Sequence, residues 1–193
     1  IGAFGASSEF PWSAEFTIKG TSSLIFHRWV IDEGDGPSKR KGSKFVFNDH
    51  HEQICDALMR VWRGDVQNLI INVPPRYSKT ELVIILFSAW CFVKNPRCEF
   101  IHLSYADTLV LENSDAIRAI IKSHAFRQLW PDLSVKESKD SKKAWETLEG
   151  GKFYATAAGG QVTGFGAGRM DEWAGTNFVF SGMLSIDDPL KPD

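Results

Sequence analysis

The side chains best suited to chemistry lie in residues 68–81, where an apolar run passes through a turn into Ser-Lys-Thr at the expected start of a helix. This is the layout of a phosphate-binding loop, in which backbone N–H groups and a helix N-terminus surround the phosphates. In such a loop a lysine, here Lys79, pairs with the phosphates and a hydroxyl, here Thr80, reaches Mg²⁺. The match to G-x-x-x-x-G-K-[ST] is incomplete, because Val73 and Ser78 occupy the two glycine positions. The loop therefore needs a partner motif before it indicates nucleotide binding.

A second motif near the C-terminus supplies that partner, because strand 183–187 is expected to end in two adjacent carboxylates, Asp187 and Asp188. Mg²⁺ prefers oxygen ligands and retains several waters, so an acid at a strand tip can hold the hydrated ion. A second acid beside it can polarise an attacking water. The alternative is a plain strand-ending turn, since Asp and Pro favour turns. The upstream loop favours the metal site, with Asp187 on the metal and Asp188 on the water.

Composition limits the class of protein. The chain has 193 residues, 43% hydrophobic and 24% charged, which predicts a soluble domain with a sizeable core. A net charge of −2 argues against a global basic field for nucleic acid, although it allows a local patch. Three cysteines, Cys55, Cys91 and Cys98, lack metal-like spacing and predict reduced intracellular thiols. The longest apolar runs are too short for a membrane span, so no membrane association is expected.

Hydrophobic periodicity predicts alternating strands and helices around the two motifs. In chain order the expected elements are helix 50–63, strand 68–73, a helix from Lys79 to Asn95, strand 99–104, helix 107–123, a helical turn at 126–130, hairpin 144–148 with 152–157, and strand 183–187. Strand 68–73 is apolar on both faces, as expected for a buried parallel strand. This order predicts an α/β fold of the P-loop NTPase type, with a mostly parallel sheet flanked by helices. Both motifs then fall at carboxyl ends of strands, where such sheets bind ligands.

The sequence patterns of three further segments are less specific. Residues 1–44 are predicted to be an N-terminal helical or linker segment, in which the basic cluster 39–41 is either solvated or in contact with a polyanion. His102, inside strand 99–104, is expected to be a sheet histidine with satisfied hydrogen bonds rather than a metal ligand. The glycine-rich segment 164–169 is either a turn or, through Arg169, a contact to DNA.

Six segments within residues 45–193 resemble, in the same order, segments of the large subunit of bacteriophage terminases, the DNA-packaging motors of tailed phages. The segments are 48–54, 74–81, 103–106 with Asn113 and Arg118 following, 129–132, 163–167 and 186–189. Segment 74–81 resembles the family's variant Walker A loop, and segment 186–189 resembles its Walker B end. The resemblance implies that residues 45–193 form the P-loop ATPase domain of such a subunit.

The resemblance also implies an activity and its partners. The family hydrolyses ATP with Mg²⁺ to drive double-stranded DNA into a preformed capsid. Its members act as a homo-oligomeric ring on a portal protein, and a small terminase subunit selects the DNA. The expected location is the cytoplasm of the infected host cell.

Residue roles follow from the same resemblance. Lys79 would contact the β- and γ-phosphates, and Thr80 and Asp187 would ligate Mg²⁺. Asp188 stands where many members have the catalytic Glu, and Arg76 could stabilise charge on the γ-phosphoryl group. A structural ion pair is the alternative for Arg76. The expected nucleotide-binding set is Pro75, Arg76, Tyr77, Ser78, Lys79, Thr80 and Glu81, with Gln53 recognising adenine through its amide.

The departures from the family keep two other functions open. Ser78 replaces the usual Gly, and its Cβ restricts the backbone, so nucleotide affinity is expected to be weak. The chain begins with Ile1 and ends 193 − 188 = 5 residues after Asp188, so the ATPase domain is expected to be truncated and the nuclease domain absent. The alternatives are another P-loop ATPase, helicase-like in type, and a non-catalytic nucleotide-binding module for assembly.

Overall fold

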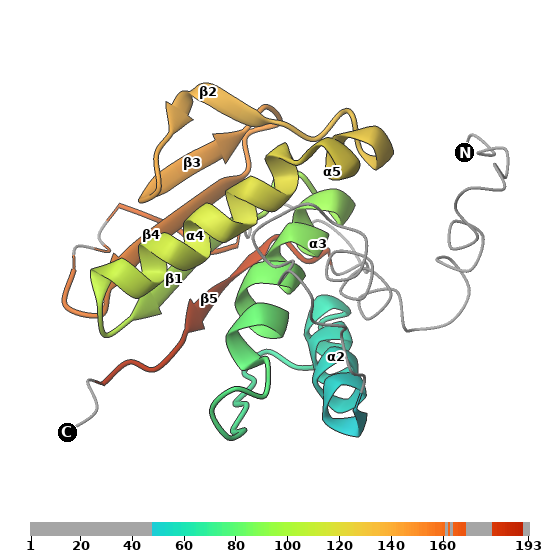
Figure 1. Cartoon of the computed structure of the whole chain (residues 1–193), viewed down its shortest axis with the longest axis vertical. Coiled ribbons are helices and arrows are strands. Elements are labelled where there is room, and N and C mark those ends of the chain that lie inside the picture. Colours follow the sequence, from blue (N-terminus) through green and yellow to red (C-terminus); the bar gives the residue numbers. More distant parts are fainter. Residues whose placement is uncertain (1–47, 161, 163, 169–178, 191–193) are drawn as a thin grey trace, which may run out of the picture.

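A five-stranded sheet organises the described part of the chain, which a computed structural model gives for residues 48–160, 162, 164–168 and 179–190 (Figure 1). The strand order is β2 (Val135–Asp140), β3 (Ala144–Thr147), β4 (Lys152–Ala157), β1 (Glu99–Ser104) and β5 (Gly182–Ile186). Residues 1–44, with the basic cluster 39–41, lie outside the described residues, as does Arg169. The predictions for these segments therefore stay predictions.

The sheet is mixed, so the expectation of a mostly parallel sheet is only partly right. β1 pairs in parallel with β4 and with β5, whereas the β2–β3 and β3–β4 pairings are antiparallel. The predicted hairpin is confirmed and accounts for one antiparallel pair, because a short turn containing Gly150 in the left-handed region reverses the chain. β2 is not among the elements that hydrophobic periodicity predicts. It is an edge strand with mostly exposed side chains, and so it lacks the apolar alternation that marks a strand in a sequence.

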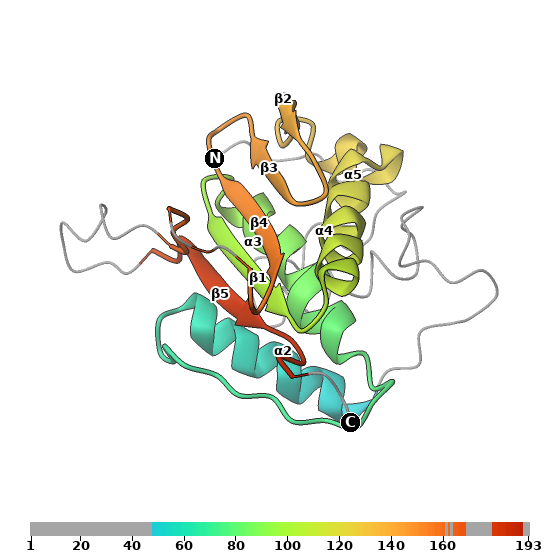
Figure 2. The same ribbon diagram turned by 90° about the vertical axis from the view of Figure 1, so that its left-hand side faces the viewer.

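Helices pack on the sheet and on one another. In chain order they are α2 (Asp49–Trp62), the π-helix η2 (Glu81–Leu86), α3 (Phe87–Lys94), α4 (Asp107–Lys122) and α5 (His124–Leu129). α4 lies against β4 and β1, and η2 packs against α2, α3 and α4. In Figures 1 and 2, α5 lies toward the β2 end of the sheet and α2 toward the β5 end. Within the described residues, no helix is both long and apolar enough to cross a membrane.

The helix that follows the phosphate-loop motif forms the centre of the core, as its apolar sequence predicts. Leu82, Leu86, Phe87 and Phe92 are completely buried, and Trp90 is nearly so. The first part of this helix is a π-helix, which the sequence did not indicate. π-Helical turns are rare in proteins overall, but those that occur often lie at functional sites.

Residues 68–73 do not form the buried parallel strand that their apolar composition predicted. They pair with no strand among the described residues, and Ile70 is 86% exposed. Ile71 and Val73 pack partly against the core, so the segment contacts the fold without joining the sheet. β5 is the edge strand on this side, with no strand on its outer edge in the described part of the chain. A strand needs a neighbour for its backbone N–H and C=O groups, which composition alone cannot reveal.

Candidate nucleotide-binding site

The two motifs predicted to work together meet in the structure. Lys79 Nζ lies 2.8 Å from Asp187 Oδ1 and 2.9 Å from Asp188 Oδ1. Thr80 Oγ1 donates a hydrogen bond of 2.5 Å to Asp187 Oδ2, across 107 residues of sequence. A lysine, a hydroxyl and two carboxylates therefore share one site, as the two-motif interpretation requires.

The acidic half of the site is held by the carboxyl end of β1. Asp187 N donates to Leu103 O at 2.9 Å, and Tyr105 N donates to Asp188 O at 3.0 Å. Ser104 Oγ also donates to Asp188 O, at 3.4 Å. These bonds hold both acids against β1, directly after the end of β5. The backbone of Asp188 lies in the left-handed region, with φ of 45°.

The loop half of the site has a different backbone. Arg76 and Ser78 both lie in the left-handed region, with φ of 70° and 60°, where residues with a Cβ are uncommon and strained. Ser78 therefore adopts the conformation for which the usual loop uses Gly. Leu82 N donates to Ser78 O at 2.9 Å, so the strained residue leads directly into the helix.

Lys79 is charged and shielded at the centre of the site. Burial acts to lower the pKa of Lys79, but hydrogen bonds and attraction to Asp187 and Asp188 outweigh it and raise the pKa above its usual value. The side chain of Asp187 is only 11% exposed, whereas that of Asp188 is 65% exposed. One acid is thus enclosed by protein and the other faces water.

The donor set fits Mg²⁺ and phosphate. The Thr80 hydroxyl and the Asp187 carboxylate are the hard oxygen donors that Mg²⁺ takes. Within the described ranges, no group of three or more His, Cys, Asp or Glu side chains could hold a metal ion by itself. A Mg²⁺ ion held by Thr80 and Asp187 would therefore draw its remaining ligands from phosphate oxygens and water, the usual arrangement in nucleotide sites.

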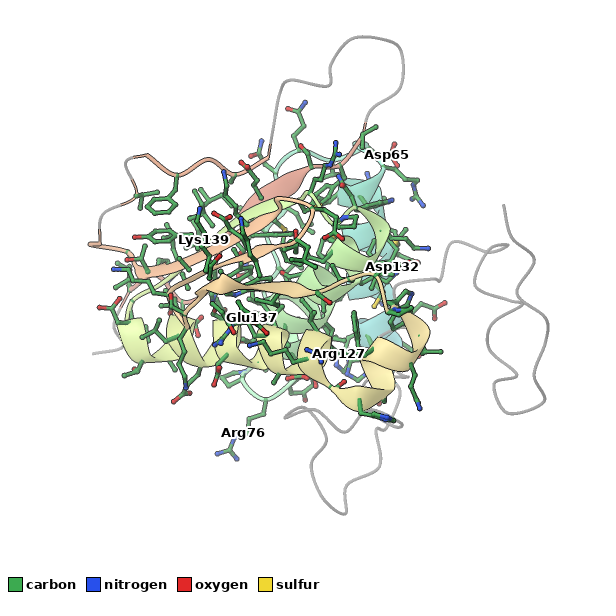
Figure 3. All side chains as sticks on the ribbon, turned by 90° about the horizontal axis from the view of Figure 1, so that it is seen from above. Asp65, Arg76, Arg127, Asp132, Glu137 and Lys139 are labelled. Carbon is green, nitrogen blue, oxygen red and sulfur yellow. The ribbon has the colours of Figure 1, made fainter. Side chains whose placement is uncertain are left out.

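Other predicted residues are not gathered at this centre. Figure 3 shows Arg76 extending from the loop away from the sheet and helices, and the structure has no ion pair of Arg76 with another described residue. The ion-pair alternative for Arg76 is therefore not supported. Pro75 and Tyr77 are exposed on the loop, and Glu81 is half-buried where η2 begins. Gln53 is exposed on α2.

Two residues near the site were not singled out by sequence reasoning. The ring of His50, in the first turn of α2, lies 5.2 Å from the ring of Tyr77, measured between centroids. His50 Nε2 is buried without a hydrogen-bond partner in the part of the chain that the structure describes. Ser104, which holds Asp188, could have been found from its position, because it is the last residue of a strand whose carboxyl end was expected to face the ligand.

Comparison of the chain with protein-family models, with curated proteins and with solved structures found no match. The function of the site is therefore inferred from its own residues. Lys79 is within bonding distance of Asp187 and Asp188, and Thr80 is within bonding distance of Asp187, whereas Arg76 lies apart on the loop.

Proposed function

We propose that the chain is a P-loop ATPase of the terminase type, which hydrolyses ATP to move double-stranded DNA into a viral capsid. The single observation that carries the proposal is the meeting of Lys79 and Thr80 with Asp187 and Asp188. A surface lysine at a helix start opposes the helix dipole, so this placement favours an anion-binding role.

Each residue has a separate task in the proposed reaction. Lys79 exchanges its carboxylate partners for phosphate oxygens when ATP binds, and Thr80 with Asp187 would hold Mg²⁺. Bound Mg²⁺ supplies charge neutralisation on the phosphates. The exposed Asp188 orients the attacking water and accepts its proton. Arg76 turns back from the loop to the γ-phosphoryl group.

The proposed partners follow from the terminase resemblance of the sequence. They are double-stranded DNA, a portal protein, a small terminase subunit and further copies of this chain in a ring. The proposed setting is the cytoplasm of the infected host cell.

A non-catalytic nucleotide-binding module for assembly is the second candidate. Two observations favour it: Arg76 points away from the site, and Ser78 is strained in the position where Gly is usual. A module of this kind would bind ATP with Mg²⁺ but would not turn it over.

The deciding experiment is ATP hydrolysis with Mg²⁺, with and without double-stranded DNA, for the chain and its Lys79→Ala variant. We expect turnover stimulated by DNA, and a loss of about 100-fold or more in the variant, because preorganised charge is lost. Lys139→Ala is the matched control, since Lys139 is also paired with a carboxylate, Glu146 at 2.7 Å, in the β2–β3 hairpin.

The outcomes separate the candidates. Turnover that survives Lys79→Ala would contradict the assigned role of the loop. Mg²⁺-dependent ATP binding without turnover would support the non-catalytic module, and absence of both binding and turnover would contradict both candidates.

A further inference from the structure

A buried chain of polar side chains connects α4 to β5 behind the candidate site. Asn113 Nδ2 of α4 lies 3.0 Å from His102 Nε2, and His102 Nδ1 lies 3.1 Å from Ser185 Oγ of β5. Ser185 Oγ in turn donates to Ile101 O at 3.4 Å. With the Asn113 amide as donor, His102 Nε2 accepts, so the imidazole proton is assigned to Nδ1 and donates to Ser185. We name these three side chains, Asn113, His102 and Ser185, the relay.

The relay suits a neutral, fully enclosed histidine. His102 is completely buried, and burial lowers its pKa to about 4, although the charge of Asp187 opposes the shift. A neutral imidazole with one donor and one acceptor is matched by its two neighbours. The prediction of a satisfied sheet histidine is confirmed, but its partners were not foreseen.

The position of the relay connects it to the metal-binding carboxylate. Ser185 is directly opposite His102 in the β1–β5 register, and Asp187 follows Ser185 by two residues. Asp187 is the first residue after β5, so the β5 backbone that the relay holds leads directly to it. β5 has no strand on its outer edge among the described residues, so its lateral position depends on β1 and on side-chain links such as this one.

α4 is also the support of the other half of the site. η2, which begins directly after Lys79 and Thr80, packs against α4. α4 therefore contacts the loop half through helix packing and the acidic half through Asn113.

We propose that Asn113, His102 and Ser185 are positioning residues that hold Asp187 in register with Thr80, using α4 as the common support of both halves. This inference rests on the proposed function for its metal-binding consequence, but not for its structural one. Partners that orient a metal ligand typically change metal affinity by about 10–100-fold when they are lost.

The test compares Ser185→Ala with Ser114→Ala. Ser114 is a matched control, because it is a buried serine of α4 whose Oγ accepts a bond of 3.0 Å from Trp145 Nε1 and has no link to β5. Both variants lose a buried hydroxyl and leave a donor without its partner, so similar losses of global stability are expected. Ser185→Thr, which retains the hydroxyl and suits a strand, is the rescue variant. Asn113→Ala breaks the relay at α4 and replaces Ser185→Ala if that variant does not fold.

Two measurements are made on each variant. In Mg²⁺ titrations of ATP binding, we expect Ser185→Ala to raise the half-maximal Mg²⁺ concentration about tenfold, with little change for Ser114→Ala or Ser185→Thr. In hydrogen exchange without nucleotide, the amides of Asp187 and Tyr105, which donate to Leu103 O and Asp188 O, should exchange about tenfold faster in Ser185→Ala alone.

Equal behaviour of Ser185→Ala and Ser114→Ala in both measurements would overturn the positioning role. If the unmodified chain shows no Mg²⁺-dependent ATP binding, the proposed function fails, and hydrogen exchange alone then decides whether the relay holds Asp187.

Discussion

The two halves of the candidate site are built in opposite ways. The acids after β5 are held by backbone and side-chain hydrogen bonds with Leu103, Ser104 and Tyr105. The loop that carries Arg76 and Ser78 is exposed, follows a segment outside the sheet, and has left-handed backbone at both residues. The difference indicates that the acidic half is preformed, and if phosphate binds as proposed, it would act mainly on the loop half. Each of the following predictions breaks or sharpens this contrast, from the largest effect to the smallest.

Replacing the exposed acid should separate chemistry from binding. For Asp188→Asn we expect turnover to fall about 100-fold or more while ATP affinity changes little, because an amide cannot accept the proton and Lys79 keeps Asp187 as a partner. The measurement is kcat beside the ATP dissociation constant, with the exposed Asp65→Asn as control. Equal losses of turnover and binding would contradict the role given to Asp188.

Low pH should lower the free energy of unfolding, because His102, which lies behind the acidic half, is held in its neutral form. The folded pKa of about 4 is below the unfolded value of 6.5, so only the unfolded chain takes up the proton between these values. The contribution of His102 to the free energy of unfolding is therefore fully present above pH 6.5 and is lost as the pH falls toward 4. At pH 5 the loss is about 2 kcal/mol. Urea unfolding at pH 7.5 and 5 measures this loss.

A variant isolates the contribution of His102 to that loss. His102→Gln should lose less stability than the unmodified chain between the same pH values, whereas the exposed His124→Gln should lose as much. The prediction is wrong if His102→Gln retains the full acid sensitivity.

Glycine at the strained loop position should relieve the loop half. For Ser78→Gly we expect a gain of roughly 0.5–1 kcal/mol in the free energy of unfolding and tighter ATP binding, because Gly adopts positive φ without a Cβ clash. Ser78→Ala keeps the Cβ and should show neither gain. A similar gain in both variants would mean that the hydroxyl, rather than the backbone, limits the loop.

The smallest effect is expected in the segment before the loop. Ile70→Thr should change the free energy of unfolding by less than about 0.5 kcal/mol, because Ile70 is exposed. The matched Ile101→Thr in β1 should be strongly destabilising, since Ile101 is buried. Equal losses in urea unfolding would mean that residues 68–73 form a buried strand in solution.

Most elements could be predicted because their signals are local. Helices α2 and α4 and strands β1 and β5 lie within a few residues of the predicted ranges. Their apolar periods report a face that must be buried, whatever lies opposite. β2 was missed because its side chains are mostly exposed, so its strand conformation depends on pairing with β3.

Ion pairs across elements could not be read from the sequence either. Asp140 of β2 forms ion pairs with Arg118 and Lys122 of α4. Arg118 Nε donates a hydrogen bond of 2.6 Å to Asp140 Oδ1. Burial acts to raise the pKa of Asp140, but the bonds and charges of these two partners outweigh it and lower the pKa. Sequence spacing alone does not identify Asp140, rather than another acid, as the partner of Arg118 and Lys122.

The sequence by itself determined the chemical groups of the site, the start of the helix after the loop and the end of β5, because residue type and local periodicity are properties of neighbouring residues. Tertiary structure alone decided that Arg76 points away and that residues 68–73 stay outside the sheet. These outcomes depend on which surfaces and backbone groups find partners far along the chain. Which of these partners form contacts depends on the packing of the whole fold.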